Sequence, residues 1–146
     1  MKIAFVIARL GEERNVIQKL ALSLAEELRR LGDQVDIQPF TRKNLFKLLP
    51  LRKLRRYDCV LIANVGLQCA YYSLYKRLGL LGKPFAAISF GSDMRSTDNL
   101  LINLFNRISK PSVDLLIVIG PDLEPIAHKR GYKNVHYVPS WAGILE

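Results

Sequence analysis

The amino-acid sequence predicts an α/β fold, a single domain built on a Rossmann-like, doubly wound parallel sheet of about six strands. Two features of the chain predict it. Short apolar runs, typical of strands buried on both faces, alternate with amphipathic helical segments. Strand and helix in this order connect by right-handed crossovers, which makes the strands parallel. The length of 146 residues suits one domain that buries a core without disulfides or metals.

The first elements follow from the hydropathy of the chain. Residues 2–8 (KIAFVIA) predict a buried strand. Apolar residues between 17 and 31 recur at steps of three and four, which predicts a helix that Gly32 is suited to end. The alternating residues 35–38 predict a more exposed strand that Pro39 stops.

The rest of the chain repeats this alternation. Residues 41–57 predict a basic helical segment. We expect the domain to span residues 1–139 and residues 140–146 to start a connection between domains. The further strands are expected at 59–63, 85–90, 115–119 and 135–138. The further helices are expected at 66–81, with Leu67, Tyr71, Leu74, Tyr75 and Leu78 on one side, at 100–108, with Leu100, Leu101, Leu104, Phe105 and Ile108 as its apolar stripe, and at 121–130.

The bulk composition constrains the partners and the location. The net charge of +9 favours an anionic partner, which can be nucleic acid, acidic lipid or a phosphorylated substrate. The two cysteines, Cys59 and Cys69, form no CxxC pair and fit a reducing cytoplasm. No apolar stretch reaches the length of a membrane span, so we expect a cytoplasmic protein, with peripheral binding at the inner face of the membrane as an option.

A ligand site is expected at the carboxyl ends of the strands, where open α/β sheets bind their ligands. The loops that follow four of the predicted strands carry glycine, mostly beside a polar or charged residue. Glycine allows a ligand to approach the backbone, and nearby helix N-termini attract anions, although such loops also need glycine for their turns. The loops in question are Arg9–Leu10–Gly11, Asn64–Val65–Gly66, Gly91–Ser92–Asp93 and Gly120–Pro121.

Several common chemistries lack their motifs. The first loop has one glycine in place of the GxGxxG of a dinucleotide site, and no GxxxxGK[ST] phosphate loop or GxSxG elbow occurs. His128 and His136 are expected to be surface or packing residues, and no metal site is predicted.

Three segments of the chain together resemble a known protein family. They are residues 20–37 (LALSLAEELRRLGDQVDI), residues 85–93 (FAAISFGSD) and residues 115–139. The family is that of GT-B glycosyltransferases, family 4 in particular, and the segments are similar to parts of its N-terminal domain: the first helix and second strand, a strand that ends in HGSD, and the stretch before the second domain. The resemblance implies a two-domain enzyme in which this domain holds the acceptor. A C-terminal domain, in the same or a separate chain, would bind the nucleotide-sugar donor. This domain itself would hold no cofactor, and the isolated chain would be inactive.

The resemblance also suggests site residues. Gly11 matches a loop glycine near the acceptor and donor phosphate, and Gly91, Ser92 and Asp93 match the loop that faces the cleft. Asp93 is the candidate general base for the acceptor hydroxyl, with helix capping as its alternative role. Departures from the family pattern put catalysis in doubt: Phe90 replaces a histidine, Gly120 replaces a serine, and residues 139–143 replace Pro-Asn-Gly.

The predicted acceptor site also includes residues taken from the rim loops. Asn64 and Gly66 follow the third predicted strand. Arg95 is a candidate partner for an acceptor phosphate, with simple solvation as its alternative.

The basic segment supplies a candidate membrane surface. Its cations interleave with leucines and are accompanied by no acidic residue, a pattern that suits docking on an anionic bilayer and a lipid-linked acceptor. The alternative is a helix that packs its leucines on the sheet and keeps its cations in water. The cations are Arg42, Lys43, Lys47, Arg52, Lys53, Arg55 and Arg56.

Three functions therefore compete. The first is the acceptor-binding half of a glycosyltransferase. The second is a basic nucleic-acid-binding domain, for which the charge is suitable but no RNA or DNA motif appears. The third is a regulatory or scaffold domain with the family fold and no transfer activity, which the Phe90 departure favours.

Overall fold

The computed structural model of the chain contains a six-stranded sheet in which every strand is parallel to its neighbours. The residues it describes are 1–8, 16–40, 54–63, 65–79, 82, 84–89, 91, 94–95 and 98–138. The strands are β1 (Lys2–Ala8), β2 (Gln34–Phe40), β3 (Cys59–Ala63), β4 (Phe85–Ser89), β5 (Leu115–Val118) and β6 (Val135–Tyr137). The helices are α1 (Val16–Arg30), α3 (Leu67–Arg77), α4 (Leu100–Ser109) and α5 (Leu123–Lys129). The predicted Rossmann-like parallel sheet is confirmed.

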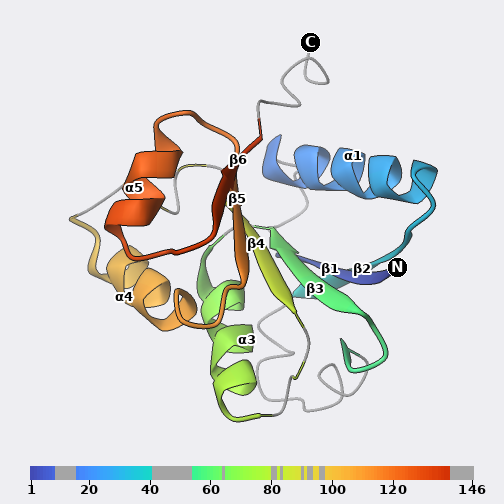
Figure 1. Ribbon diagram of the computed structural model, residues 1–146, viewed down its shortest axis with the longest axis horizontal. Coiled ribbons are helices and arrows are strands. Elements are labelled where there is room, and N and C mark those ends of the chain that lie inside the picture. The colour runs from blue at the N-terminus through green and yellow to red at the C-terminus, as the bar shows by residue number, and fades with distance from the viewer. Residues whose placement is uncertain are drawn as a thin grey trace.

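The strand order is β2-β1-β3-β4-β5-β6. The chain therefore adds β2 on one side of β1, crosses back to place β3 on the other side, and then continues outward strand by strand. Figure 1 shows α1 over one face of the sheet and α3, α4 and α5 over the other. This is the doubly wound arrangement expected from alternating strands and helices.

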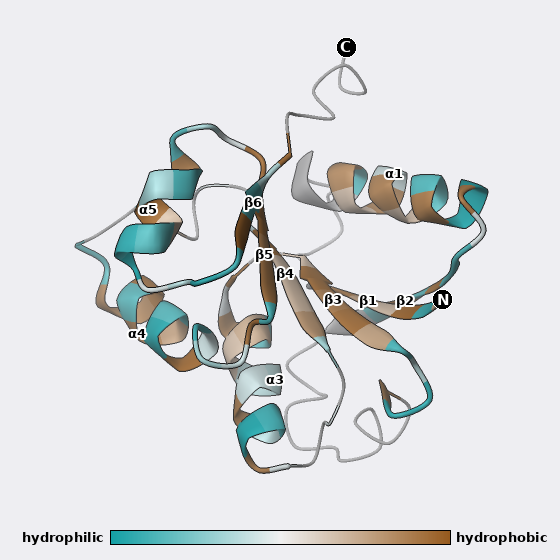
Figure 2. Cartoon of the chain, in the orientation of Figure 1, coloured by the Kyte–Doolittle hydropathy of each residue, from teal (hydrophilic) through white to brown (hydrophobic). Residues whose placement is uncertain are grey.

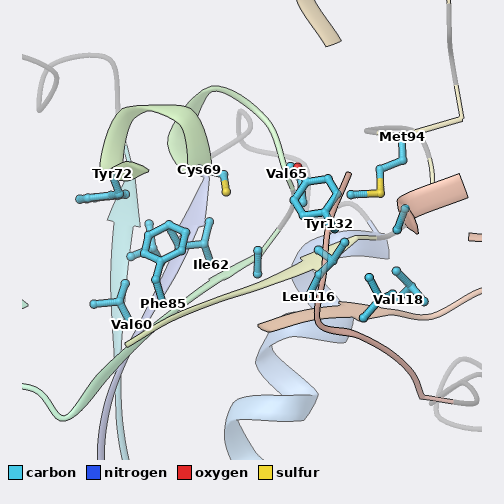
Figure 3. Packing of buried hydrophobic residues seen from close by; sticks show 14 of the residues in the cluster. Val60, Ile62, Val65, Cys69, Tyr72, Phe85, Met94, Leu116, Val118 and Tyr132 are labelled. Carbon is cyan, nitrogen blue, oxygen red and sulfur yellow. The ribbon is translucent and has the colours of Figure 1, made fainter. Parts of the chain in front are cut away.

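Two hydrophobic clusters fill the space between the sheet and these helices, because successive side chains of a strand point to opposite faces. Ile3, Phe5 and Ile7 of β1 pack with Ala21 and Ala25 of α1. The intervening side chains join the cluster beneath α3 and α5. The members of that cluster labelled in Figure 3 are Val60, Ile62, Val65, Cys69, Tyr72, Phe85, Met94, Leu116, Val118 and Tyr132. Figure 2 shows the strands as a mainly hydrophobic layer through the middle of the molecule.

The prediction that Pro39 stops the second strand was wrong. The strand β2 continues to Phe40, and Pro39 is paired in register with Ile7. Because β2 lies at the edge of the sheet and pairs with β1 alone, the missing N–H of proline can fall on the open side of the strand. An edge position thus accommodates a residue that a central strand would exclude.

The predicted helices form, with small differences at their ends. Asn99 caps α4, where its Oδ1 accepts from the N–H of Leu101 at 3.0 Å and of Ile102 at 3.3 Å.

In the described parts of the chain, no helix is long and apolar enough to cross a bilayer. Of the predicted basic helical segment 41–57, residues 41–53 lie outside the described residues, Leu54 is helical, and 55–57 turn toward β3.

The burial of Tyr72 gives the fold a measurable response to alkaline pH. Its side chain is 4% exposed, and burial raises the pKa of the Tyr72 phenol from 10.0 to about 12. A raised folded-state pKa means that this stabilisation is complete below pH 10 and is lost as the pH rises through the folded value.

As the pH rises from 10.0 to about 12 and beyond, we expect the free energy of unfolding to fall by about 2 kcal/mol more in the wild type than in Tyr72→Phe. Denaturant titrations at several pH values measure it. Tyr137→Phe, at the half-exposed end of β6, is the matched control and should follow the wild type. If the free energy of unfolding had the same pH dependence in the wild type and in Tyr72→Phe, ionisation of Tyr72 would not destabilise the fold.

Candidate functional site

The topology places a reversal of strand order between β1 and β3. From β1 the chain moves to β2 on one side, and from there to β3 on the other, so the segments after β1 and β3 leave in opposite directions. Open α/β sheets bind ligands in the crevice that this divergence creates at the carboxyl ends of the strands. Gly66 follows β3 at this edge, whereas the predicted Gly11 and Asn64 lie outside the described residues.

The turn between β3 and α3 is closed by a buried amide. Gly66 is the N-cap of α3 and has no side chain to cap it, and its carbonyl accepts from the N–H of Ala70 at 3.1 Å. Gln68 is 5% exposed, and its Nε2 donates to the carbonyl of Ala63, the last residue of β3, at 2.9 Å. This bond ties the start of the helix to the end of the strand, so it fixes the rim at the reversal point.

A second rim turn follows β4. Gly91 is buried and has φ of 119°, a conformation that favours glycine. Its carbonyl accepts from the N–H groups of Met94 at 3.0 Å and Arg95 at 2.9 Å. Met94 is fully buried in the core beneath α5 and anchors the turn. The predicted catalytic Asp93 and its neighbour Ser92 belong to this turn in sequence but lie outside the described residues.

An ion pair joins this turn to the next rim loop. The Arg95 guanidinium donates from Nε to Oδ2 of Asp122 at 2.8 Å and from Nη2 to Oδ1 at 3.0 Å. These hydrogen bonds hold the pKa of the Asp122 carboxyl below its usual value of 3.8. Both side chains are about half exposed. Arg95, predicted to bind an acceptor phosphate or to be solvated, therefore has a carboxylate partner across the rim.

The two rim glycines lie directly against this ion pair. A Cβ added at Gly91 would lie 2.4 Å from Nη1 of Arg95. A Cβ added at Gly120 would lie 2.8 Å from Oδ1 of Asp122 and 3.1 Å from Nη2 of Arg95. The arginine and the aspartate thus occupy, in this arrangement, space that a side chain at either position would enter.

A second arginine supports the rim from α5. Arg130 donates from Nε and Nη2 to the carbonyl of Met94, at 3.0 and 2.7 Å, and from Nη1 to Oδ1 of Asn103 at 2.9 Å. It connects the end of α5, the turn after β4 and helix α4. Arg130 therefore holds the backbone of this turn, and Arg95, which belongs to the turn, holds it to the next loop through its own side chain.

The sequence interpretation missed Gln68, Asp122 and Arg130. Gln68 could have been found as a polar residue two positions after Gly66. Asp122 could have been found as the acidic residue that follows Gly120–Pro121. Arg130 gave no local signal, because its partner Met94 lies 36 positions earlier in the chain.

Only the end of the basic segment is described. Leu54 is 1% exposed and packs in the core beneath α3, while Arg55 and Arg56 are exposed. The Tyr57 hydroxyl donates to Oδ2 of Asp36 at 2.6 Å, which raises the pKa of Tyr57 and ties the segment to β2. For Leu54 the packing alternative holds. The predicted membrane-surface residues Arg42, Lys43, Lys47, Arg52 and Lys53 lie outside the described residues.

Other candidate chemistry is sparse in the part of the chain that the structure describes. No group of three or more His, Cys, Asp or Glu side chains there could hold a metal ion. His136 contacts Asn134 at 3.1 Å, and Cys69 lies on the buried side of α3. The rim at the carboxyl ends of β3, β4 and β5 therefore remains the candidate site.

Comparison with known proteins supports the fold. No protein-family model matches the chain, and no curated protein matches its sequence. The chain is similar to the crystal structure of Alr3699/HepE from Anabaena in complex with UDP, with a TM-score of 0.61 and 11% sequence identity. The match covers 95% of this chain and 44% of the HepE chain, so this chain spans less than half of that protein. At this identity the likeness concerns the fold alone, and it supports a GT-B-like fold.

The contact between Gly91 and Arg95 yields a prediction with a matched control. Gly91→Ala introduces a Cβ into the Arg95 guanidinium, so we expect the pKa of Asp122, followed by carboxyl NMR, to rise back toward 3.8. Gly32→Ala is the matched control, because Gly32 has a comparable positive φ of 102° with nothing within 4 Å of an added Cβ. It should cost about 1 kcal/mol of backbone strain and leave the pKa of Asp122 unchanged.

The sign of the pH effect follows from the lowered pKa. The ion pair contributes stability above the ordinary carboxyl pKa and loses it as the pH falls through the lowered value. An Asp122 pKa in Gly91→Ala equal to that of the wild type would show that Arg95 does not depend on the space over Gly91.

Proposed function

We propose that the chain is the acceptor-binding half of a glycosyltransferase, which acts with a donor-binding second domain. The observation that carries the proposal is the glycine-bearing rim at the reversal of strand order. Gly66 lies at the reversal itself, and Gly91 and Gly120 lie on the neighbouring loops. This is where open α/β sheets bind ligands.

The rim suits a ligand that binds close to the backbone. Sugars and phosphates are bound through hydroxyl and anionic oxygens, which can approach peptide N–H groups where no Cβ intervenes. Gln68, Arg130 and the Arg95–Asp122 pair hold the loops before a ligand arrives, so less conformational freedom is lost on binding.

Arg95 is the candidate contact for a phosphate of the acceptor. Its guanidinium is half exposed and already engaged with a carboxylate in a fork geometry that a phosphate can also match. On this proposal the phosphate shares or replaces Asp122 as the partner of Arg95. Asp122 then acts as the group that keeps the guanidinium oriented in the absence of acceptor.

The donor is assigned to a second domain, in the same chain or in a separate one. The solved HepE structure contains UDP, and the present chain matches less than half of that protein. Together with the resemblance in the sequence, this supports a nucleotide-sugar donor that binds mainly outside residues 1–139. We propose no cofactor or metal for this domain itself.

Asp93 is the proposed general base. It would accept the proton of the acceptor hydroxyl while the hydroxyl oxygen bonds to the anomeric carbon and the bond from that carbon to the nucleotide phosphate breaks. The assignment rests on the family resemblance of residues 85–93.

A cytoplasmic chain whose basic segment meets the inner membrane face would suit a lipid-linked acceptor. Arg55 and Arg56 are the described cations of that segment, and both are exposed. A scaffold role without transfer is the second candidate, and the specific observation that favours it is Phe90 in place of the family's histidine. A nucleic-acid-binding role has the net charge of +9 in its favour and no motif.

Acceptor binding can be tested on the chain itself with a short-chain polyprenyl phosphate as the probe. In amide NMR titrations we expect shifts at Gly66, Gly91 and Gly120, and weaker, non-saturating changes with UDP. Arg95→Gln should weaken probe binding about tenfold, since one charge-assisted contact is removed. Lys133→Gln, an exposed cation just before β6 and away from the rim, is the control. Shifts confined to residues away from the rim would contradict the proposal.

Transfer can be tested separately. The purified chain should show no turnover with any nucleotide sugar, and activity should require the donor domain. In the complete enzyme, Asp93→Asn should lower kcat about 10²- to 10⁴-fold with little change in the KM for the acceptor. Asp98→Asn, an exposed aspartate just before α4, should behave like the wild type. Turnover by the isolated chain, or full activity of Asp93→Asn, would refute the corresponding assignment.

A further inference from the structure

Helices α3 and α4 bury mainly small and polar side chains, together with Tyr72, against the protein. The buried residues of α3 are Gln68, Cys69, Ala70, Tyr72 and Ser73. Those of α4 are Asn106 and Ser109. Asn106 is held there by hydrogen bonds, because its Nδ2 donates to the carbonyl of Ile102 at 2.8 Å and its Oδ1 accepts from the Tyr132 hydroxyl at 2.8 Å. The rotation of α4 is therefore fixed by buried polar contacts.

The leucines of these two segments, in contrast, face outward. Leu78, at the end of α3, is 71% exposed and Leu100, at the start of α4, is 83% exposed. We call this surface the α3–α4 leucine face, and its members are Leu67, Leu74, Leu78, Leu100, Leu101 and Leu104.

The two helices lie side by side, so their leucines belong to one surface (Figure 1). Arg77 of α3 donates from Nη2 to the carbonyl of Ile108 of α4 at 2.7 Å. Ser112, just after α4, donates from Oγ to the carbonyl of Ser73 at 3.2 Å. Tyr71 and Tyr75 lie edge to face on α3, with ring centroids 4.8 Å apart, and are partly buried against the core.

The same two segments are positively charged. Residues 66–79 and 99–110 contain Lys76, Arg77, Arg107 and Lys110 and no aspartate or glutamate. The nearest acidic residues are Asp114, which pairs with Lys76, and Asp98, which precedes the cap of α4. The leucine face is therefore accompanied by an excess of positive charge.

These two properties together specify the occupant. A cluster of exposed leucines marks a surface that is covered in use. A second copy of this chain would bring the same cations against each other, whereas an anionic bilayer accepts both the leucines and the cations. We propose that the α3–α4 leucine face docks on an anionic membrane surface. Because Leu67 directly follows Gly66, docking by this face brings the rim close to the bilayer.

The proposal is tested by co-sedimentation of the full chain with phosphatidylcholine vesicles, with and without about 30% phosphatidylglycerol. We expect binding to the anionic vesicles and little to the neutral ones. The double variant Leu78→Gln with Leu101→Gln should lower the partition coefficient at least about tenfold, since two leucines no longer enter the interface. Arg107→Gln should lower it about fivefold.

Leu31→Gln is the matched control, because Leu31 is 75% exposed, as Leu78 is, but lies at the end of α1 on the other face of the sheet. It should bind like the wild type. The substituted leucines are exposed, so the fold should be retained, and circular dichroism checks this. The vesicles contain no acceptor, so the result is independent of sugar transfer.

Three results would overturn the proposal. One is equal binding to neutral and anionic vesicles, or binding to neither. Another is wild-type binding by the leucine variant while Arg55→Gln with Arg56→Gln abolishes binding, which would assign docking to the basic segment alone. The third is a dimer in sedimentation equilibrium that the leucine variant dissociates, which would assign the face to a second copy.

Discussion

The parallel pairing of β1 with β2 on one side and β3 on the other is the constraint on which the rest of the structure depends. It places the most buried strand at the centre of the reversal, with Phe5 and Val6 fully buried on opposite faces. It also sends the chain outward in opposite directions from one point, and open α/β sheets bind their ligands at such a point. This pairing places Gly66 at the reversal, and the parallel pairing of β4 and β5 beyond β3 brings Gly91 and Gly120 to the same edge of the sheet.

Side chains distant in sequence then fix the rim. Arg95 and Asp122 connect the loops after β4 and β5, and Arg130 holds the backbone of the first loop from α5. Charge-assisted hydrogen bonds of this kind are individually modest at an exposed surface, but they restrict the loops to one arrangement. The proposed acceptor site and the proposed membrane face share this framework, since α3 begins at the rim and carries the leucines away from it.

The sequence was sufficient to predict the sheet, because a strand buried on both faces needs a continuous apolar run, as residues 2–8 and 59–63 show. It was not sufficient to predict how α3 and α4 are rotated. An apolar stripe such as Leu100, Leu101 and Leu104 predicts a helix, but which face meets the core depends on the packing of Asn106 against Tyr132, a contact between distant residues. The turn at Gly91 could be predicted from neighbouring residues in the sequence. The Arg95–Asp122 pair could not, because its two residues are 27 positions apart. The end of the second strand was predicted wrongly at Pro39, because an edge strand can contain proline and only the topology shows that β2 lies at the edge.

The central claim is that the carboxyl-end rim of the sheet binds the acceptor head group. Photolabelling with a polyprenyl phosphate that carries a diazirine next to the phosphate, followed by peptide mapping, tests it most directly. The account predicts label on peptides that contain Gly66, Gly91 or Asp122. Label concentrated at the opposite edge of the sheet, near Pro84 and Asp114, would contradict it.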